Sequence, residues 1–217
     1  MQDGAGKTGK IVIISSPSGG GKTSICRRLL DSDVGRAEGW QFSVSYTTRP
    51  KRPDETDGKE YHFVDRQAYD KLVSDGFFAE YFTVHGNCYG TPREPLEQAL
   101  HNGSTILLDV DYKGALRLKR QYPEAITIFI LPPPPVTDSL KERLSKRGTE
   151  SAQDLGIRFR NALDEMKQFD KFEYIVINRD LDEAVRQVLD IIEQHPSPEH
   201  PCRTDNMNVE QLRTIIG

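Results

Sequence analysis

Short apolar runs alternate with amphipathic segments along most of this chain. The run Ile11–Ile14 consists of uncharged, β-branched residues, as expected of a strand that is buried in a parallel sheet. The pattern predicts five strands, at Ile11–Ser15, Gln41–Ser45, Thr105–Asp109, Ala125–Leu131 and Tyr174–Ile177.

Helices are predicted between these strands, and several of them are followed by residues that end helices. Gly76 and Gly103 each follow a predicted helix, and Pro123 lies just after a third. Because strands and helices alternate, we expect an α/β fold in which helices flank a parallel five-stranded sheet. The predicted helices are Thr23–Leu30, Arg66–Ser74, Arg93–Asn102, Tyr112–Arg120, Asp138–Lys146, Ala152–Gln168 and Leu181–Gln194, with a short one near Val209–Ile215.

Two regions interrupt the alternation of strands and helices. Residues 46–92 contain short polar and aromatic pieces, and residues 138–170 are helical and rich in arginine. We interpret both as insertions into the sheet core, one to hold a substrate that accepts a group and the other to cover the donor. Residues 1–9 are expected to be a disordered leader. The sequence assigns no function to the polar, proline-bearing extension 196–217.

Composition narrows the class of protein. The formal net charge of −4 over 217 residues lacks the basic excess that is typical of nucleic-acid binding. No apolar stretch approaches the roughly 18–20 residues of a membrane span. Cys26, Cys88 and Cys202 form neither a zinc pattern nor a disulfide framework, which favours a reducing cytoplasm. The sequence carries no signal for an oligomeric state.

A glycine-rich turn follows the first strand and precedes the first helix. Successive glycines without Cβ atoms can bring their N–H groups close to phosphate oxygens, at the N-terminus of the helix. The turn matches the P-loop pattern GxxxxGK[ST] except that Ser16 replaces the first glycine. An ordinary glycine turn is the alternative. The predicted ATP-binding residues are Ser16, Pro17, Ser18, Gly19, Gly20, Gly21, Lys22 and Thr23.

The loop is the first of several motifs that occur in a fixed order along the chain. They read SPSGGGKT, SVSYTTRPKRPDETDGKEYHF, FFAEYFTVHGNCYGT, ILLDVD and IFILPP, and then RLSKRGTE followed by Arg158 and Ala162. From about Ile11 to Ile192 the chain resembles the guanylate kinases. The resemblance implies ATP-dependent phosphorylation of GMP, or of dGMP, in purine nucleotide metabolism and GMP recycling, with Mg²⁺ bound together with ATP.

The resemblance also implies a P-loop NTPase-type fold with three parts inside a domain at 10–195. The core comprises 10–45, 93–136 and 171–195. A mixed α/β region at 46–92 binds GMP, and a helical lid comprises 137–170.

The acceptor-binding residues are assigned by the resemblance. Arg49 and Arg52 match the pair that grips the GMP phosphate, and two guanidinium groups suit a dianion. Glu80 matches the carboxylate that accepts hydrogen bonds from guanine N1–H and the exocyclic amine. Adenine presents no such donor edge. The remaining predicted GMP contacts are Ser45, Tyr61, Tyr89, Thr91 and Asp111.

The donor side is assigned in the same way. Lys22 is expected to hold the ATP phosphates, while Thr23 and, through water, Asp109 hold magnesium. Asp109 and Asp111 both follow a strand, at the edge where ligands bind in open α/β sheets. The expected catalytic residues are Lys22, Arg49, Arg143, Arg147 and Arg158, the last three from the lid.

Some of these residues could instead have purely structural roles. The lid arginines could form a solvated helix face, and Tyr61 and Tyr89 could be packing residues. We assign no catalytic role to His62 or His85, because a phosphate oxygen that is already charged needs no strong base. Two other functions stay open: a non-catalytic guanylate-kinase-like module that binds proteins, and a kinase for another phosphorylated acceptor such as a ribose bisphosphate.

Overall fold

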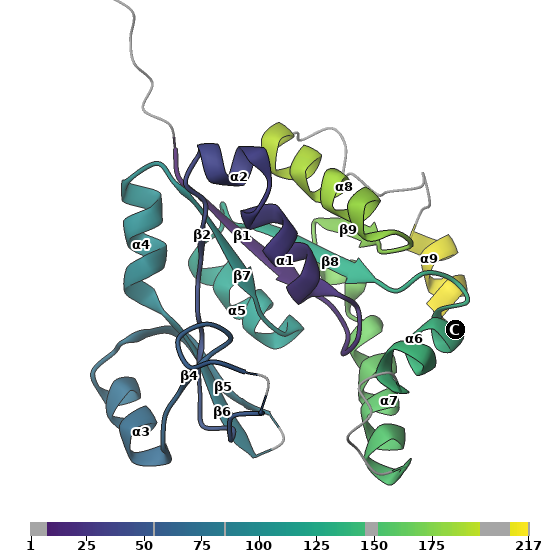
Figure 1. The fold of residues 1–217 in the computed structure, drawn as a ribbon, viewed down its shortest axis with the longest axis horizontal. Coiled ribbons are helices and arrows are strands. Elements are labelled where there is room, and N and C mark those ends of the chain that lie inside the picture. The colour runs from purple at the N-terminus through teal and green to yellow at the C-terminus, as the bar shows by residue number, and fades with distance from the viewer. Residues whose placement is uncertain (1–7, 54, 85, 146–151, 196–208, 217) are drawn as a thin grey trace, which may run out of the picture.

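The computed structural model describes residues 8–53, 55–84, 86–145, 152–195 and 209–216, which fold into two sheets and surrounding helices (Figure 1). The larger sheet has five parallel strands in the order β2-β7-β1-β8-β9. This sheet confirms the predicted α/β fold. Its strands are β2 (Gln41–Phe42), β7 (Thr105–Asp109), β1 (Lys10–Ser15), β8 (Ile126–Leu131) and β9 (Tyr174–Ile177).

The second strand is shorter than predicted. We expected Gln41–Ser45, but β2 ends at Phe42, and only the Ser43 N–H continues the pairing, by donating to the Leu107 carbonyl. The chain then leaves this sheet, because Tyr46 already pairs in the second sheet. The serines that follow β2 therefore connect the two sheets.

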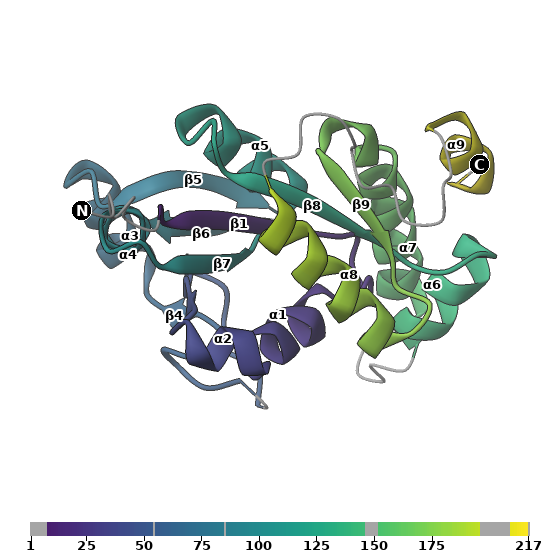
Figure 2. The ribbon, with the colours of Figure 1, turned by 90° about the horizontal axis from the view of Figure 1, so that it is seen from above.

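Helices cover both faces of the five-stranded sheet (Figure 2). The helices α1 (Lys22–Leu30) and α8 (Leu181–Gln194) bury apolar side chains on one face. The helices α4 (Arg93–His101), α5 (Tyr112–Gln121) and α7 (Ala152–Met166) lie on the other. A short helix that the sequence did not predict, α2 (Asp33–Ala37), begins at the cap Ser32, whose side chain accepts from the Gly35 N–H.

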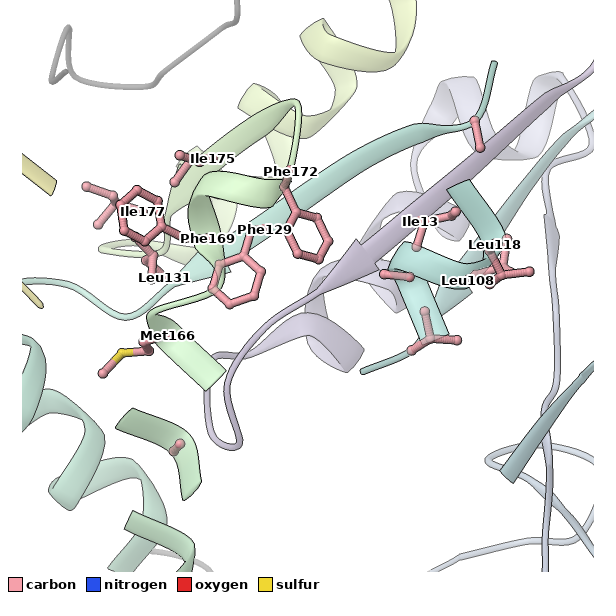
Figure 3. Packing of buried hydrophobic residues seen from close by; sticks show 14 of the residues in the cluster. Ile13, Leu108, Leu118, Phe129, Leu131, Met166, Phe169, Phe172, Ile175 and Ile177 are labelled. Carbon is pink, nitrogen blue, oxygen red and sulfur yellow. The ribbon is translucent and has the colours of Figure 1, made fainter. Parts of the chain in front are cut away.

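The core on the second face is continuous from the sheet centre to its β9 edge (Figure 3). Ile13 and Leu108 come from adjacent strands and pack with Leu118 of α5. Farther along, the Phe129 and Phe172 rings have centroids 4.9 Å apart. Burial of these side chains stabilises the five-stranded sheet and so holds the carboxyl ends of its strands in place.

The second sheet has four short strands in the order β4-β3-β6-β5. The pair β3–β4 is parallel and the other pairs are antiparallel, so the sheet is mixed. Together with α3 (Arg66–Ser74), it agrees with the mixed α/β character expected of residues 46–92. The strands are β3 (Tyr46–Thr47), β4 (His62–Phe63), β5 (Phe78–Val84) and β6 (Asn87–Pro92).

Beyond β8, the chain forms α6 (Val136–Ser145) and α7, and a 3₁₀ turn, η1 (Phe169–Lys171), leads into β9. The last described element is α9 (Val209–Ile216), which packs beside α6 (Figure 1). Arg147, Cys202, His85 and residues 1–7 of the expected leader lie outside the described residues. Among the residues that are described, no helix is long and apolar enough to cross a membrane.

Candidate active site

The glycine-rich loop, residues 16–23, joins the end of β1 to the start of α1. Gly19 and Gly21 have positive φ angles of 86° and 95°, which L-residues with a Cβ rarely adopt. The Gly20 N–H donates to the Pro17 carbonyl over 2.9 Å, so the turn is closed by its own backbone. The strand, loop and helix thus occur in the order that the sequence predicted.

Asn178, which follows β9, and Arg143 of α6 hold this loop. The Asn178 side-chain amide donates to the Gly20 carbonyl over 3.1 Å. Arg143 of α6 donates to the same carbonyl over 3.4 Å and to the Asn178 carbonyl over 2.9 Å. Arg143 therefore contacts the loop directly rather than forming part of a solvated helix face.

Helix α7 contacts the loop at Ser18. The Arg158 guanidinium donates to Ser18 Oγ over 3.0 Å, and the Ser18 N–H donates to Glu165 Oε2 over 3.0 Å. Sequence reasoning missed Glu165 and Asn178. Asn178 could have been found, because it directly follows the carboxyl end of β9. For Glu165 the available signal is its spacing of two helical turns from Arg158 on the same helix.

Lys22, Thr23 and Asp109 meet where β7 ends beside the loop. Thr23 Oγ1 donates to Asp109 Oδ2 over 2.6 Å, and Lys22 Nζ lies 3.5 Å from Asp109 Oδ1. Burial alone would lower the pKa of Lys22, but Asp109, Tyr61 and Glu165 favour the charged form and raise this pKa above 10.5. The hydroxyl and carboxylate oxygens are the hard donors that Mg²⁺ prefers, so this pair fits the predicted metal.

Glu80, on strand β5 of the second sheet, has a strongly raised pKa. It is 3% exposed, and burial raises its pKa from 4.5 to about 7; a hydrogen bond from Thr91 opposes the increase and Asp111 adds to it. Thr91 Oγ1 donates to Glu80 Oε1 over 2.6 Å. Among the described residues, Glu80 Oε2 has no hydrogen-bond partner. This buried acceptor oxygen is available to a ligand that brings its own donors.

The surroundings of Glu80 include two other predicted residues. Asp111 caps α5 by accepting from the Gly114 N–H over 2.8 Å, and burial raises its pKa. A Cβ added to Gly114 would lie 3.5 Å from Glu80 Cδ, so α5 approaches this carboxylate closely. Ser45 is buried and directly precedes Tyr46, which pairs with Gly90 next to Thr91.

Arg49 and Arg52 converge on a carboxylate that the sequence analysis missed. Arg49 lies 2.6 Å from Glu55 Oε1, and the Arg52 guanidinium lies 3.9 Å from the same oxygen. Although burial opposes it, the bonds from Arg49 and from the Arg52 N–H hold the pKa of Glu55 below its ordinary value. Two cations thus face one carboxylate, an arrangement that also suits a phosphate dianion.

The two predicted tyrosines, Tyr61 and Tyr89, lie next to each other near Arg49. The Tyr61 and Tyr89 rings have centroids 5.9 Å apart, and the Arg49 guanidinium lies 5.5 Å from the centroid of the Tyr61 ring. Burial, with Asp109 adding to it, raises the pKa of Tyr61 to about 12. Tyr61 therefore carries a neutral hydroxyl and lies near both Arg49 and the Lys22–Asp109 pair. His62 instead packs against Tyr46, with ring centroids 4.5 Å apart.

This fold and site define a nucleotide-dependent phosphotransferase. A glycine-rich loop with a lysine joins β1 to α1, and the region of the second sheet supplies an arginine pair and a buried carboxylate. The protein-family model described as guanylate kinase matches residues 8–195. The chain belongs to the guanylate kinase family, whose enzymes phosphorylate GMP with ATP.

Individual relatives agree with this assignment. The chain is 43% identical over 188 residues to a guanylate kinase of Syntrophotalea carbinolica, and the aligned region covers 86% of each chain. It is 44% identical over 184 residues to that of Thermotoga maritima, covering 85% of this chain and 86% of the other. The crystal structure of guanylate kinase from Anaplasma phagocytophilum matches with a TM-score of 0.70 and 32% identity, over 87% and 86% of the two chains.

Proposed function

We propose that this enzyme transfers the γ-phosphoryl group of ATP directly and in line to the phosphate of GMP, and also of dGMP. The bond between the γ-phosphorus and the β–γ bridging oxygen breaks, and one from the γ-phosphorus to a GMP phosphate oxygen forms. ADP leaves with the bond electrons. The observation that carries the proposal is Glu80 Oε2, a buried oxygen that lies near Asp111 and has no hydrogen-bond partner within the described part of the chain.

Guanine is the base that this environment favours. An ionised Glu80 would accept from guanine N1–H and the 2-amino group, with Asp111 and Ser45 nearby and Thr91 orienting the carboxylate. Adenine would place an acceptor where Glu80 needs a donor. None of these proposed contacts addresses the ribose 2′-hydroxyl, which supports acceptance of dGMP.

The acceptor phosphate is proposed to replace Glu55 as the partner of Arg49 and Arg52. These guanidinium groups already lie together, so binding requires a change of partner rather than assembly of the site. Tyr61 and Tyr89 would donate hydroxyls to the same phosphate. The charged phosphate oxygen attacks without a general base, because it carries no proton to remove at neutral pH.

On the donor side, Lys22 and the loop N–H groups would bind the β- and γ-phosphates. Thr23 and Asp109 would hold Mg²⁺ with the nucleotide, Asp109 through water; the ion supplies neutralisation of phosphate charge when it is bound. Arg143, Arg147 and Arg158 are proposed to neutralise the transferring group. The contacts of Arg143 and Arg158 with the loop support this role.

We further propose the division of the domain 10–195 into the core, the GMP-binding region 46–92 and the lid, residues 137–170. Closure of the lid would exclude water that could otherwise hydrolyse ATP. The proposed setting is purine nucleotide metabolism in the cytoplasm, and the free thiols of Cys26 and Cys88 fit a reducing compartment.

A substrate panel of GMP, dGMP, IMP, AMP and UMP tests the proposal, with ADP release as the measurement. We expect GMP and dGMP to be phosphorylated and IMP, which lacks the 2-amino group, to be phosphorylated less well. AMP should be disfavoured by a factor of at least about 100 in kcat/KM, because a site built around hydrogen bonds rejects a base that leaves them unmade. Equal efficiency with GMP and AMP would contradict the role of Glu80.

A further inference from the structure

The C-terminal helix α9 lies outside the part of the chain that the guanylate kinase model matches. That match ends at residue 195, whereas α9 comprises Val209–Ile216. The helix nevertheless packs on the rest of the protein: Leu212 is 2% exposed and Ile216 is 6% exposed. Both belong to the same buried cluster as Leu140 of α6 and Phe169 of η1.

Helix α9 contacts both ends of the proposed lid. It packs against α6, the first lid helix, and both helices lie at the same end of the molecule (Figures 1 and 2). Arg213 donates to Asp170 Oδ2 over 2.8 Å, and Asp170 belongs to η1, which follows the second lid helix, α7. One short helix therefore contacts both α6, which begins the proposed lid, and Asp170, which ends it.

Helix α6 transmits this contact to the glycine-rich loop. A Cβ added to Gly19 would lie 3.4 Å from Leu144 Cδ2 and 3.7 Å from Arg143 Cβ, which are ordinary packing distances. Arg143, on the same helix, donates to the Gly20 carbonyl. Buried side chains thus form a continuous path from α9 through α6 to the loop, and a packed path of this kind transmits displacements.

We propose that α9 is a brace for the lid. Leu212, Arg213 and Ile216 are positioning residues that hold α6, and with it Arg143, against the glycine-rich loop. They touch neither substrate and act through Arg143, so the inference rests on the role proposed above for that residue. The extension 196–217 thereby acquires a function in phosphoryl transfer.

A double-mutant cycle between Leu212→Ala and Arg143→Ala tests the brace, with kcat and both KM values measured by ADP release. Leu212→Ala should lower kcat about tenfold and change the KM for GMP less than about twofold, since a small misplacement of a charge-neutralising group weakens the transition state alone. In the Arg143→Ala background, Leu212→Ala should have no further effect on kcat.

Ile191→Ala is the matched control. Ile191 of α8 is 3% exposed, and its cluster lies on the opposite face of the sheet. This variant loses a comparable core volume in a cluster that contains no residue of α6. If it lowers kcat as much as Leu212→Ala does, or if Leu212→Ala lowers kcat equally in both Arg143 backgrounds, the brace is refuted. An Arg143→Ala variant with full kcat would instead refute the role of Arg143.

The Arg213–Asp170 ion pair gives a second test that leaves the core intact. Arg213→Glu and Asp170→Arg should each lower kcat about two- to fivefold, because exposed ion pairs make small contributions. The double variant should recover the wild-type kcat by restoring the pair in reverse. Failure of the charge swap to recover kcat would count against the brace even if Leu212→Ala does not fold.

Discussion

Replacement of Glu80 by glutamine is expected to stabilise the protein above neutral pH while impairing guanine recognition. The carboxylate is buried, and its pKa rises from 4.5 to about 7, mainly because burial disfavours the charge. Glutamine keeps an oxygen that can accept from Thr91 Oγ1 but carries no charge. The substitution therefore removes the electrostatic cost and the functional carboxylate together.

The direction of the pH dependence follows from the raised pKa of Glu80. Below pH 4.5 the side chain is protonated in both the folded and the unfolded chain, so it contributes no difference. Between pH 4.5 and about 7 the unfolded chain loses its proton first, and the free energy of unfolding falls as pH rises. Since one pH unit in pKa corresponds to about 1.4 kcal/mol, the loss totals about 3 kcal/mol above about pH 7.

Denaturant unfolding without nucleotide measures this effect, at about pH 5 and about pH 8 for each protein. The stability gained by Glu80→Gln should be about 2.5 kcal/mol larger at the higher pH, because a small part of the loss has already occurred at about pH 5. Glu124→Gln, at an exposed position, serves as the control and should show no such change. In the same preparations the KM for GMP should rise about 100-fold in Glu80→Gln. Parallel pH profiles for wild type and Glu80→Gln would refute the reasoning.

Substitutions at two further positions test the roles of Lys22 in the loop and of Glu165, which contacts the loop from α7. Lys22→Met should abolish turnover and leave the Kd for GMP, measured by calorimetry, within about threefold of wild type, because Lys22 belongs to the donor side. An equal loss of GMP binding would contradict that separation. Glu165→Ala should raise the KM for ATP about tenfold by leaving the Ser18 N–H without its acceptor, whereas Glu165→Gln, whose amide oxygen can accept the same bond, should stay close to wild type. Equal losses in both Glu165 variants, seen in ATP titrations, would show that charge matters rather than the hydrogen bond.

The five-stranded sheet could be predicted because its strands carry their own signal. Every residue of β8, Ile126–Leu131, is buried, and all but Thr127 are apolar, so the strand is visible in the sequence as a nearly continuous apolar run. The second sheet could be predicted only as an irregular region. Its strands β3 and β4 have two residues each, too few to show a period, and Tyr46 pairs with His62 across a long connection.

The site likewise has one part that a local sequence pattern reveals and another part that it does not. The glycine-rich loop is contiguous in sequence, so its lysine and glycines could be identified at once. Glu165 and Asn178, which also hold the loop, were missed because they contact it from 147 and 158 positions away, and only their places on α7 and directly after β9 offered a signal. A hydrogen bond between such distant residues depends on how α7 and β9 pack, which no local pattern records. Glu55 was missed for a different reason: its partners are close by, but a carboxylate among arginines resembles an ordinary surface ion pair.

The contacts on the loop explain why position 21 must be glycine. Its φ of 95° already disfavours other residues, and an added Cβ would lie 2.4 Å from the Asn178 amide nitrogen. That amide and Arg143 hold the Gly20 carbonyl. Because a trans peptide unit is planar, the Gly21 N–H points opposite to the Gly20 carbonyl, away from Asn178. Asn178 therefore fixes the orientation of the Gly21 N–H, one of the loop N–H groups that we propose to bind phosphate, and Arg143 adds to this control from α6.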